Sequence, residues 1–175
     1  MRINFLSTMR LLAFALYAAL LTSCWKTIPP EYKAFLDLSR DAQLGRMRRM
    51  PIDKQIDYYF AGQEYVHPPL SLDDTIAERG KEAIPFILKR LKEEEKDYRK
   101  VFLLYTLRRM HDFHYDLRGE KEAIETLQGV TAKMESRMHK EVAEGIVKDI
   151  VENRPPDLER FKRERPHIFT NANHQ

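Results

Sequence analysis

Residues 80–110 read GKEAIPFILKRLKEEEKDYRKVFLLYTLRRM, and this stretch decides the fold. Between Ile84 and Leu91, apolar residues recur at the i, i+3, i+4 and i+7 spacing of one helical face. The run VFLLYTL at 101–107 is apolar almost all round, and residues 108–110 extend a helical pattern past the usual length of a strand, which is the alternative. We therefore predict an amphipathic helix followed by a central helix that neighbours cover on both sides.

Working outward, the spacing of apolar residues predicts further helices. Ser71 is the expected N-cap of a short helix, and Gly80 is its expected C-cap or a kink. Strand signals are nearly absent, so we predict an all-α fold of antiparallel helical hairpins. Whether Glu135-Ser136 separates two helices or lies inside one long helix is left open. The further helices are expected at about 31–50, 71–79, 120–134 and 138–152, with one more that begins at Pro51 and ends near either Ala61-Gly62 or Tyr65.

The segment GKEAIPFIL at 80–88 resembles the start of a HEAT-type repeat helix, which commonly reads G-x-x-A-I-P-x-L-I. Together with the next apolar helix, the resemblance covers about residues 73–112, the length of one repeat unit. It implies a short HEAT-like α-solenoid, although the sequence holds no convincing second copy. An ordinary helical hairpin is the alternative.

The N-terminus has the charge and hydropathy pattern of an export signal. Arg2 and Arg10 are its charged residues, an apolar run covers 11–21, and no acidic residue occurs before Cys24. That run is too short to cross a bilayer, because a spanning helix needs about 20 apolar residues. A basic segment followed by an apolar one of this length is typical of a secretory signal peptide. A buried N-terminal helix and an uncleaved signal anchor are the alternatives.

The sequence Leu21-Thr22-Ser23-Cys24 resembles the lipobox of bacterial lipoproteins, which is Leu, two small residues and Cys. The resemblance implies cleavage between Ser23 and Cys24, a diacylglycerol on the Cys24 sulfur and often an acyl chain on the new amino group. It further implies a bacterial cell-envelope protein whose domain faces the periplasm. Trp25 stands where an Asp would retain such a protein in the inner membrane, so the outer membrane is favoured. We expect no cofactor besides this covalent lipid.

Composition limits the partners of the mature chain. Cleavage before Cys24 leaves 28 of the 30 Lys and Arg residues against 27 Asp and Glu, so the product is almost neutral. A nucleic-acid-binding protein would show a clear basic excess, so we expect no nucleic acid partner. We divide the chain into a signal peptide (1–23), a tether (24–30), an α-helical domain (31–153) and a C-terminal tail (154–175).

The densest group of potential metal ligands is the segment HDFHYD at 111–116. We expect a loop from His111 to Gly119. If the segment were helical, His111 and His114 would share a face and Asp116 could approach from the loop. Two imidazoles and a carboxylate can hold zinc or iron, so a metal-dependent envelope enzyme is one hypothesis. The alternative is a polar helix end, where histidine suits the negative pole of the dipole.

Two further segments are candidate contact surfaces. An aromatic corner would suit a protein interface if its side chains were exposed, although such residues are more often core. A basic patch, Arg46–Met50 with Arg40 and Lys54, would suit anionic lipid or a glycan phosphate, although a solvated helix end explains it as well. The corner's interface candidates are Tyr58, Tyr59, Tyr65 and His67.

Catalytic signatures are missing from the sequence. It has no G-x-S-x-G elbow, no P-loop and no G-x-G-x-x-G, and Glu93–Glu95 are consecutive, so they point in different directions. We therefore expect no enzyme. The leading hypothesis is a lipid-anchored protein whose helical domain binds another protein or organises an envelope assembly.

Overall fold

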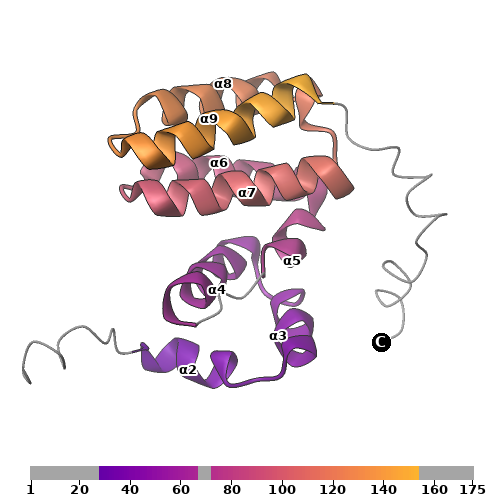
Figure 1. Cartoon of the computed structure of the whole chain (residues 1–175). Helices are drawn as coiled ribbons and strands as arrows, with labels where there is room; N and C mark the ends of the chain where they lie inside the picture. The colour runs from indigo at the N-terminus through magenta and orange to yellow at the C-terminus, as the bar shows by residue number, and fades with distance from the viewer. Residues whose placement is uncertain (1–27, 67–71, 154–175) are drawn as a thin grey trace, which may run out of the picture. The chain divides into compact units, whose positions relative to one another are not determined.

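The computed structural model describes residues 28–66 and 72–153 (Figure 1). Within these ranges the regular elements are helices and no strand occurs, which confirms the all-α fold. Two 3-10 turns, η1 (Gly80–Ala83) and η2 (Leu117–Gly119), precede α6 and α8. The α-helices are α2 (Pro30–Leu36), α3 (Arg40–Met47), α4 (Ile52–Tyr65), α5 (Asp73–Ala77), α6 (Ile84–Glu93), α7 (Asp97–Phe113), α8 (Lys121–Ala132) and α9 (Arg137–Glu152).

The single helix expected at 31–50 is wrong, because the chain breaks before Ser39. The Ser39 backbone is extended, and its hydroxyl oxygen accepts a hydrogen bond from the Ala42 amide at 3.4 Å, so Ser39 caps a new helix, α3. The chain divides into two compact units between Asp37 and Leu38. Helix α2, which has Pro30 in its first turn and a buried Phe35, belongs to the first unit. Helices α3 to α9 belong to the second.

Gly80 redirects the chain, as expected from the sequence. Its φ is +53°, in the left-handed region that glycine adopts at little cost. The turn η1 follows, and α6 then begins with Pro85 in its first turn, where the missing amide is not needed. Helix α5 ends at Ala77, two residues before the expected Arg79. The expected cap, Ser71, lies outside the described residues.

Helices α6 to α9 form two hairpins that lie side by side (Figure 1). Helix α7 contacts both α5 and α9, and α6 contacts α8, so equivalent helices of successive pairs are neighbours. Contacts between Asp97 and Ser136 near the start of each helix, and between His111 and Asn153 near the end, show that α7 and α9 run in the same direction. A solenoid stacks its repeats in this way.

Helix α7 is the central helix that its sequence predicts. Val101, Leu103, Leu104, Leu107 and Met110 are all buried, and all of them except Val101 are completely inaccessible to solvent. The break before α9 is also real, because the Ser136 hydroxyl caps α9 through the His139 amide.

Two polar clamps fix α7 in the stack. Asp97, at its first turn, accepts hydrogen bonds from the amides of Glu135 and Ser136, each at 2.8 Å, which ties α7 to the start of α9. Burial opposes ionisation of Asp97, but the Ser136 amide and Lys100 outweigh it and lower the pKa of this carboxyl. A buried charge here is therefore matched by donors.

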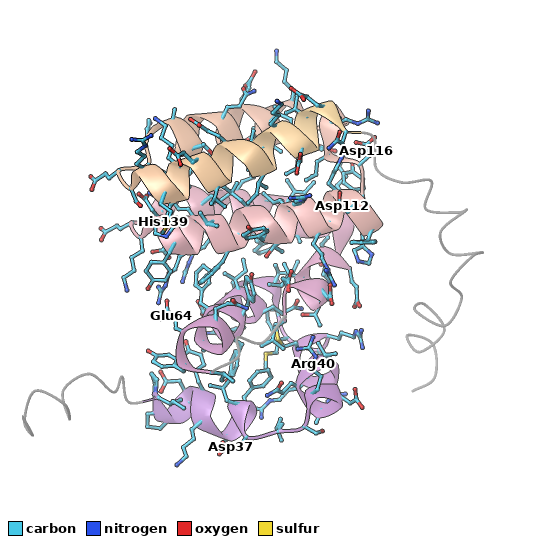
Figure 2. All side chains as sticks on the ribbon, viewed as in Figure 1. Asp37, Arg40, Glu64, Asp112, Asp116 and His139 are labelled. Carbon is cyan, nitrogen blue, oxygen red and sulfur yellow. The ribbon has the colours of Figure 1, made fainter. Side chains whose placement is uncertain are left out.

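The second clamp joins α7 to α4. Glu64, buried near the end of α4, accepts hydrogen bonds from the Tyr98 hydroxyl at 2.9 Å and from the Arg99 guanidinium at 3.0 Å (Figure 2 labels Glu64). The same guanidinium lies 5.0 Å from the centre of the Phe60 ring, which is within cation–π range. Because Glu64 and Phe60 both belong to α4, this cluster holds α4 against the outward side of α7.

Candidate docking groove

One face of α7 is left open by its neighbours and carries aromatic and charged side chains. Phe102, Tyr105, Arg109 and Asp112 follow one another at spacings of three and four residues, so they share one face. The Tyr105 ring is 44% exposed, whereas residues on either side of it in the chain are buried. Exposed aromatic and arginine side chains are enriched in protein interfaces.

This face forms one side of a shallow groove of about 460 Å³. Helix α4 supplies Tyr59 and Gln63 to the opposite wall, and α5 supplies Asp73. The Tyr59 hydroxyl donates to the carbonyl oxygen of Phe102 at 3.4 Å, and burial raises the pKa of that hydroxyl. The groove therefore has a buried, uncharged aromatic floor and charged rims.

Both arginines of the groove are held in place by carboxylates. The Arg109 guanidinium makes two hydrogen bonds to Asp74, which raise its pKa, and it lies 5.4 Å from the centre of the Phe113 ring. Arg108 reaches across to α9 and pairs with Asp149 at 3.0 Å. Pairing fixes each guanidinium while leaving part of it at the surface, which suits a preorganised binding site.

Asp73 differs from these charges. Burial and the neighbouring Asp74 carboxylate raise the pKa of Asp73 above its usual range. In the described part of the chain its carboxylate forms no ion pair, although Arg109 and Arg40 lie near enough to favour its charge. A half-buried carboxylate that faces a groove without an ion pair is a ready acceptor for a cation from elsewhere.

A second hollow, of about 380 Å³, lies between α6 and α8. Its charged groups are used within the fold: Lys81 pairs with Glu120 at 3.0 Å, and Lys92 with Glu122 at 3.7 Å. Exposed lysine–glutamate pairs are typical of a solvated surface. The groove over α7 is therefore the stronger candidate.

The aromatic corner expected from the sequence is only partly a surface. Tyr59 is buried, which fits the core alternative for this residue, and it forms the groove floor. Tyr58 and Tyr65 are half-buried. His67 lies outside the described residues.

The loop expected at 111–119 is wrong at its start, because α7 continues to Phe113 and His111 is helical and buried. His111 Nδ1 accepts a hydrogen bond from the Leu117 amide at 3.2 Å, so Nε2 carries the proton and donates to the Asn153 carbonyl at 3.0 Å. Both ring nitrogens are thus used by the fold itself.

The other two metal candidates also have local roles. His114 stands at the C-cap of α7, where its backbone amide donates to the Met110 carbonyl oxygen. Asp116 accepts hydrogen bonds from the Arg118 guanidinium, which hold the pKa of Asp116 at about 2. Among the described residues, no group of three or more His, Cys, Asp or Glu side chains is placed to hold a metal ion (Figure 2 labels Asp112 and Asp116). The metal hypothesis gains no support from this geometry.

The residues of the basic patch do not all lie free on the surface, because some are buried or paired with carboxylates. Met47 is buried, and Arg48 makes a two-point contact with Glu78 at 2.8 Å. Lys54 lies 3.7 Å from Asp57. Arg46 and Arg49 remain exposed on and after the last turn of α3. Arg40 and the paired Arg48 are exposed as well. Each exposed arginine contributes about 1 kcal/mol at an anionic membrane, so the lipid-binding hypothesis stays a prediction.

The lipidation and cleavage residues, Cys24 and Ser23, lie outside the described residues, as does the tail from Arg154. No helix within the described ranges is both long and apolar enough to span a bilayer.

Comparison with known proteins gives no relative for this chain. No family model, no curated protein and no solved structure matches it. The resemblance to HEAT repeats therefore stays a prediction from the sequence. The structure itself shows only that the helices are stacked.

Sequence reasoning missed three main residues of the groove: Phe102, Tyr105 and Asp73. The first two lie inside VFLLYTL, where an almost unbroken apolar run hides which side chains face outward. Asp73 looks like an ordinary acidic residue in the first turn of a helix. A helical projection of 102, 105, 109 and 112 would have placed the α7 residues on one face.

Proposed function

We propose that this chain is a lipid-anchored protein of the bacterial cell envelope whose helical domain binds another protein through the groove over α7. Cys24 would carry the anchor, and the domain would face the periplasm, with the outer membrane favoured. The lipobox and the export signal support the anchor. A single acyl chain binds a membrane only weakly, so a diacylglycerol with a further acyl chain suits a firm attachment.

The single observation behind the binding role is the exposed aromatic and arginine surface on a helix that is otherwise core. Tyr105 is 44% exposed in a run whose other large side chains are mostly buried. Tyr105 stands beside Arg108 and Arg109 in the lining of the same groove. Tyrosine and arginine in a partly desolvated groove are the residues that dominate measured binding energies at protein interfaces.

Lipidation is tested by labelling cells with an alkyne analogue of palmitate. We expect the label on the wild-type chain, a loss of mass that matches cleavage before Cys24, and neither change in the variant Cys24→Ser. An unlabelled wild-type protein that keeps its full-length mass would contradict the anchor.

Binding is tested by chemical crosslinking of the full-length protein in its own envelope. We expect a discrete adduct whose yield falls about tenfold in Tyr105→Ser, because one central interface tyrosine can contribute 2 kcal/mol or so. The matched control is Arg137→Ser, since Arg137 is 93% exposed at the start of α9, away from the groove. An adduct that survives Tyr105→Ser and disappears in Arg137→Ser would place the binding surface elsewhere.

A further inference from the structure

The chain leaves the described fold beside the groove. Asn153 is the last described residue, and His111 holds its carbonyl oxygen at 3.0 Å. The Asn153 amide and side chain both contact Asp149, which in turn pairs with Arg108 on the groove rim. A continuous set of contacts therefore joins the start of the tail to the end of the groove.

Charge around the groove is negative. Its carboxylates outnumber its guanidiniums, and one of them, Asp73, forms no ion pair with a described residue. The lining itself holds Asp73 and Asp112 against Arg108 and Arg109. With the paired carboxylates Asp74 and Asp149, and with Arg40 near Asp73, four carboxylates face three guanidiniums.

The tail has the opposite charge, and one of its apolar residues, Phe161, lies among the basic ones. The segment at 160–165 reads RFKRER, with Phe161 between two cations, Arg160 and Lys162. The whole tail at 154–175 holds five Lys and Arg residues against three Asp and Glu. A phenylalanine flanked by cations matches a groove that offers aromatic rings and a carboxylate.

The distances also agree. From Phe113 back to Phe102 the axis of α7 rises by about 16 Å, at 1.5 Å per residue. The eight residues from Asn153 to Phe161 can span up to about 27 Å when extended. The extended length of this segment therefore exceeds the length of the groove along α7.

We propose that the C-terminal tail of this same chain docks in the groove over α7, with Phe161 against Tyr105 and with Arg160 or Lys162 paired to Asp73. An outside partner would then bind by displacing the tail. The docking shares the groove with the proposed function but needs neither the lipid nor the partner, so each can fail without the other.

The test uses the full-length protein expressed in a bacterial host, with the photoreactive p-benzoylphenylalanine in place of Tyr105. After irradiation, mass spectrometry identifies the peptides that are joined to α7. We expect intrachain crosslinks that fall within residues 154–175 and centre on Phe161. The same probe in place of Glu125, a residue of α8 that is 64% exposed, should give no such product.

Charge reversal in the tail supplies the matched comparison, and it leaves every residue of the described helices unchanged. In Arg160→Glu, Lys162→Glu, Arg163→Glu we expect the crosslink yield to fall about tenfold, as for the loss of two or three exposed ion pairs. The opposite triple variant, Asp157→Lys, Glu159→Lys, Glu164→Lys, should keep or raise the yield. The wild-type yield should also fall as salt is raised, because the pairs are exposed.

Three results would overturn the inference. The first is a Tyr105 probe that reacts only with another protein, which would leave the proposed function standing. The second is a tail crosslink that joins two copies of the chain, which would show an intermolecular contact. The third is a tail crosslink whose yield is equal in the two triple variants, because charge would then not direct the docking.

Discussion

Helices α7 and α9 have nearly the same length, 17 and 16 residues, and run in the same direction, yet their sequences look different. Helix α7 has α5 on one side and α9 on the other, so its apolar residues show little periodicity. Helix α9 ends the described stack, and its buried residues, Ala143, Ile146, Val147 and Ile150, keep the three-and-four spacing of one face. The number of helices packed against each helix therefore determines how its apolar residues are spaced in the sequence.

The comparison explains why an exposed aromatic residue is stronger evidence of a binding surface on α7 than on α9. The exposed side of α9 carries pairs such as Arg137–Glu141 and Lys148–Glu152, which suit a solvated helix surface at the end of the described stack. On α7 most of the surface is taken by neighbours, and the narrow strip that remains carries Tyr105. A scarce exposed strip on a core helix is where we expect function.

The largest difference between the two helices should appear on truncating an apolar side chain in each. Leu104 of α7 is fully buried, so Leu104→Ala should lower the free energy of unfolding by about 3 kcal/mol. Val142 of α9 is 37% exposed, so Val142→Ala should cost about 0.5 kcal/mol. Urea unfolding measures both. Equal losses would show that α9 is as central as α7.

The next effect concerns the contact that joins the ends of the two helices. His111→Phe keeps an aromatic ring, of somewhat larger volume, but leaves the Leu117 amide and the Asn153 carbonyl without a partner, so it should cost about 2 kcal/mol. The control is His139→Phe, because the buried His139 Nδ1 has no hydrogen-bond partner among the described residues. It should cost less than about 1 kcal/mol. If zinc raised the melting temperature of the wild type and not of His111→Phe, a metal role for His111 would return.

The contact of Asp97 with the start of α9 should contribute less to the free energy of unfolding than the His111 contact, and its contribution should depend on pH. Asp97→Asn weakens the hydrogen bonds to the Glu135 and Ser136 amides and should cost about 1.5 kcal/mol at pH 7. The fold lowers the pKa of Asp97, so the unfolded chain takes up the proton first as pH falls. The stability difference between wild type and variant should therefore be complete above about pH 4 and shrink below it. A difference that grew towards acid pH would have the wrong sign.

The smallest expected effect is a gain in stability rather than a loss. Gly145 lies within α9 and a Cβ added there meets no atom within 4 Å, so Gly145→Ala should raise the free energy of unfolding by about 0.5–1 kcal/mol. Gly80→Ala is the matched control. Its φ of +53° strains a side chain, so that variant should lose about 1 kcal/mol. A loss in Gly145→Ala would show that something packs on this face of α9.

Much of the fold could be predicted from the sequence because α6 and α9 each bury one face, and the spacing records it. The break at Ser39 was missed because apolar residues continue on both sides of it, and only the local cap separates α2 from α3. The groove could not be predicted because it depends on which face of α7 the neighbours leave open. Asp73 illustrates the limit, since whether it has an ion-pair partner is decided by helices distant in sequence.

The most direct test compares Tyr105→Ser on α7 with Val142→Ser on α9, two residues of similar exposure, 44% and 37%. The measurement is the yield of the partner adduct when each full-length variant is crosslinked in its own envelope. We expect Tyr105→Ser to lose about nine-tenths of the adduct and Val142→Ser to keep it, because one central aromatic anchor dominates such an interface. Full adduct in Tyr105→Ser, with loss in Val142→Ser, would move the docking surface to α9 and contradict the central role given to α7.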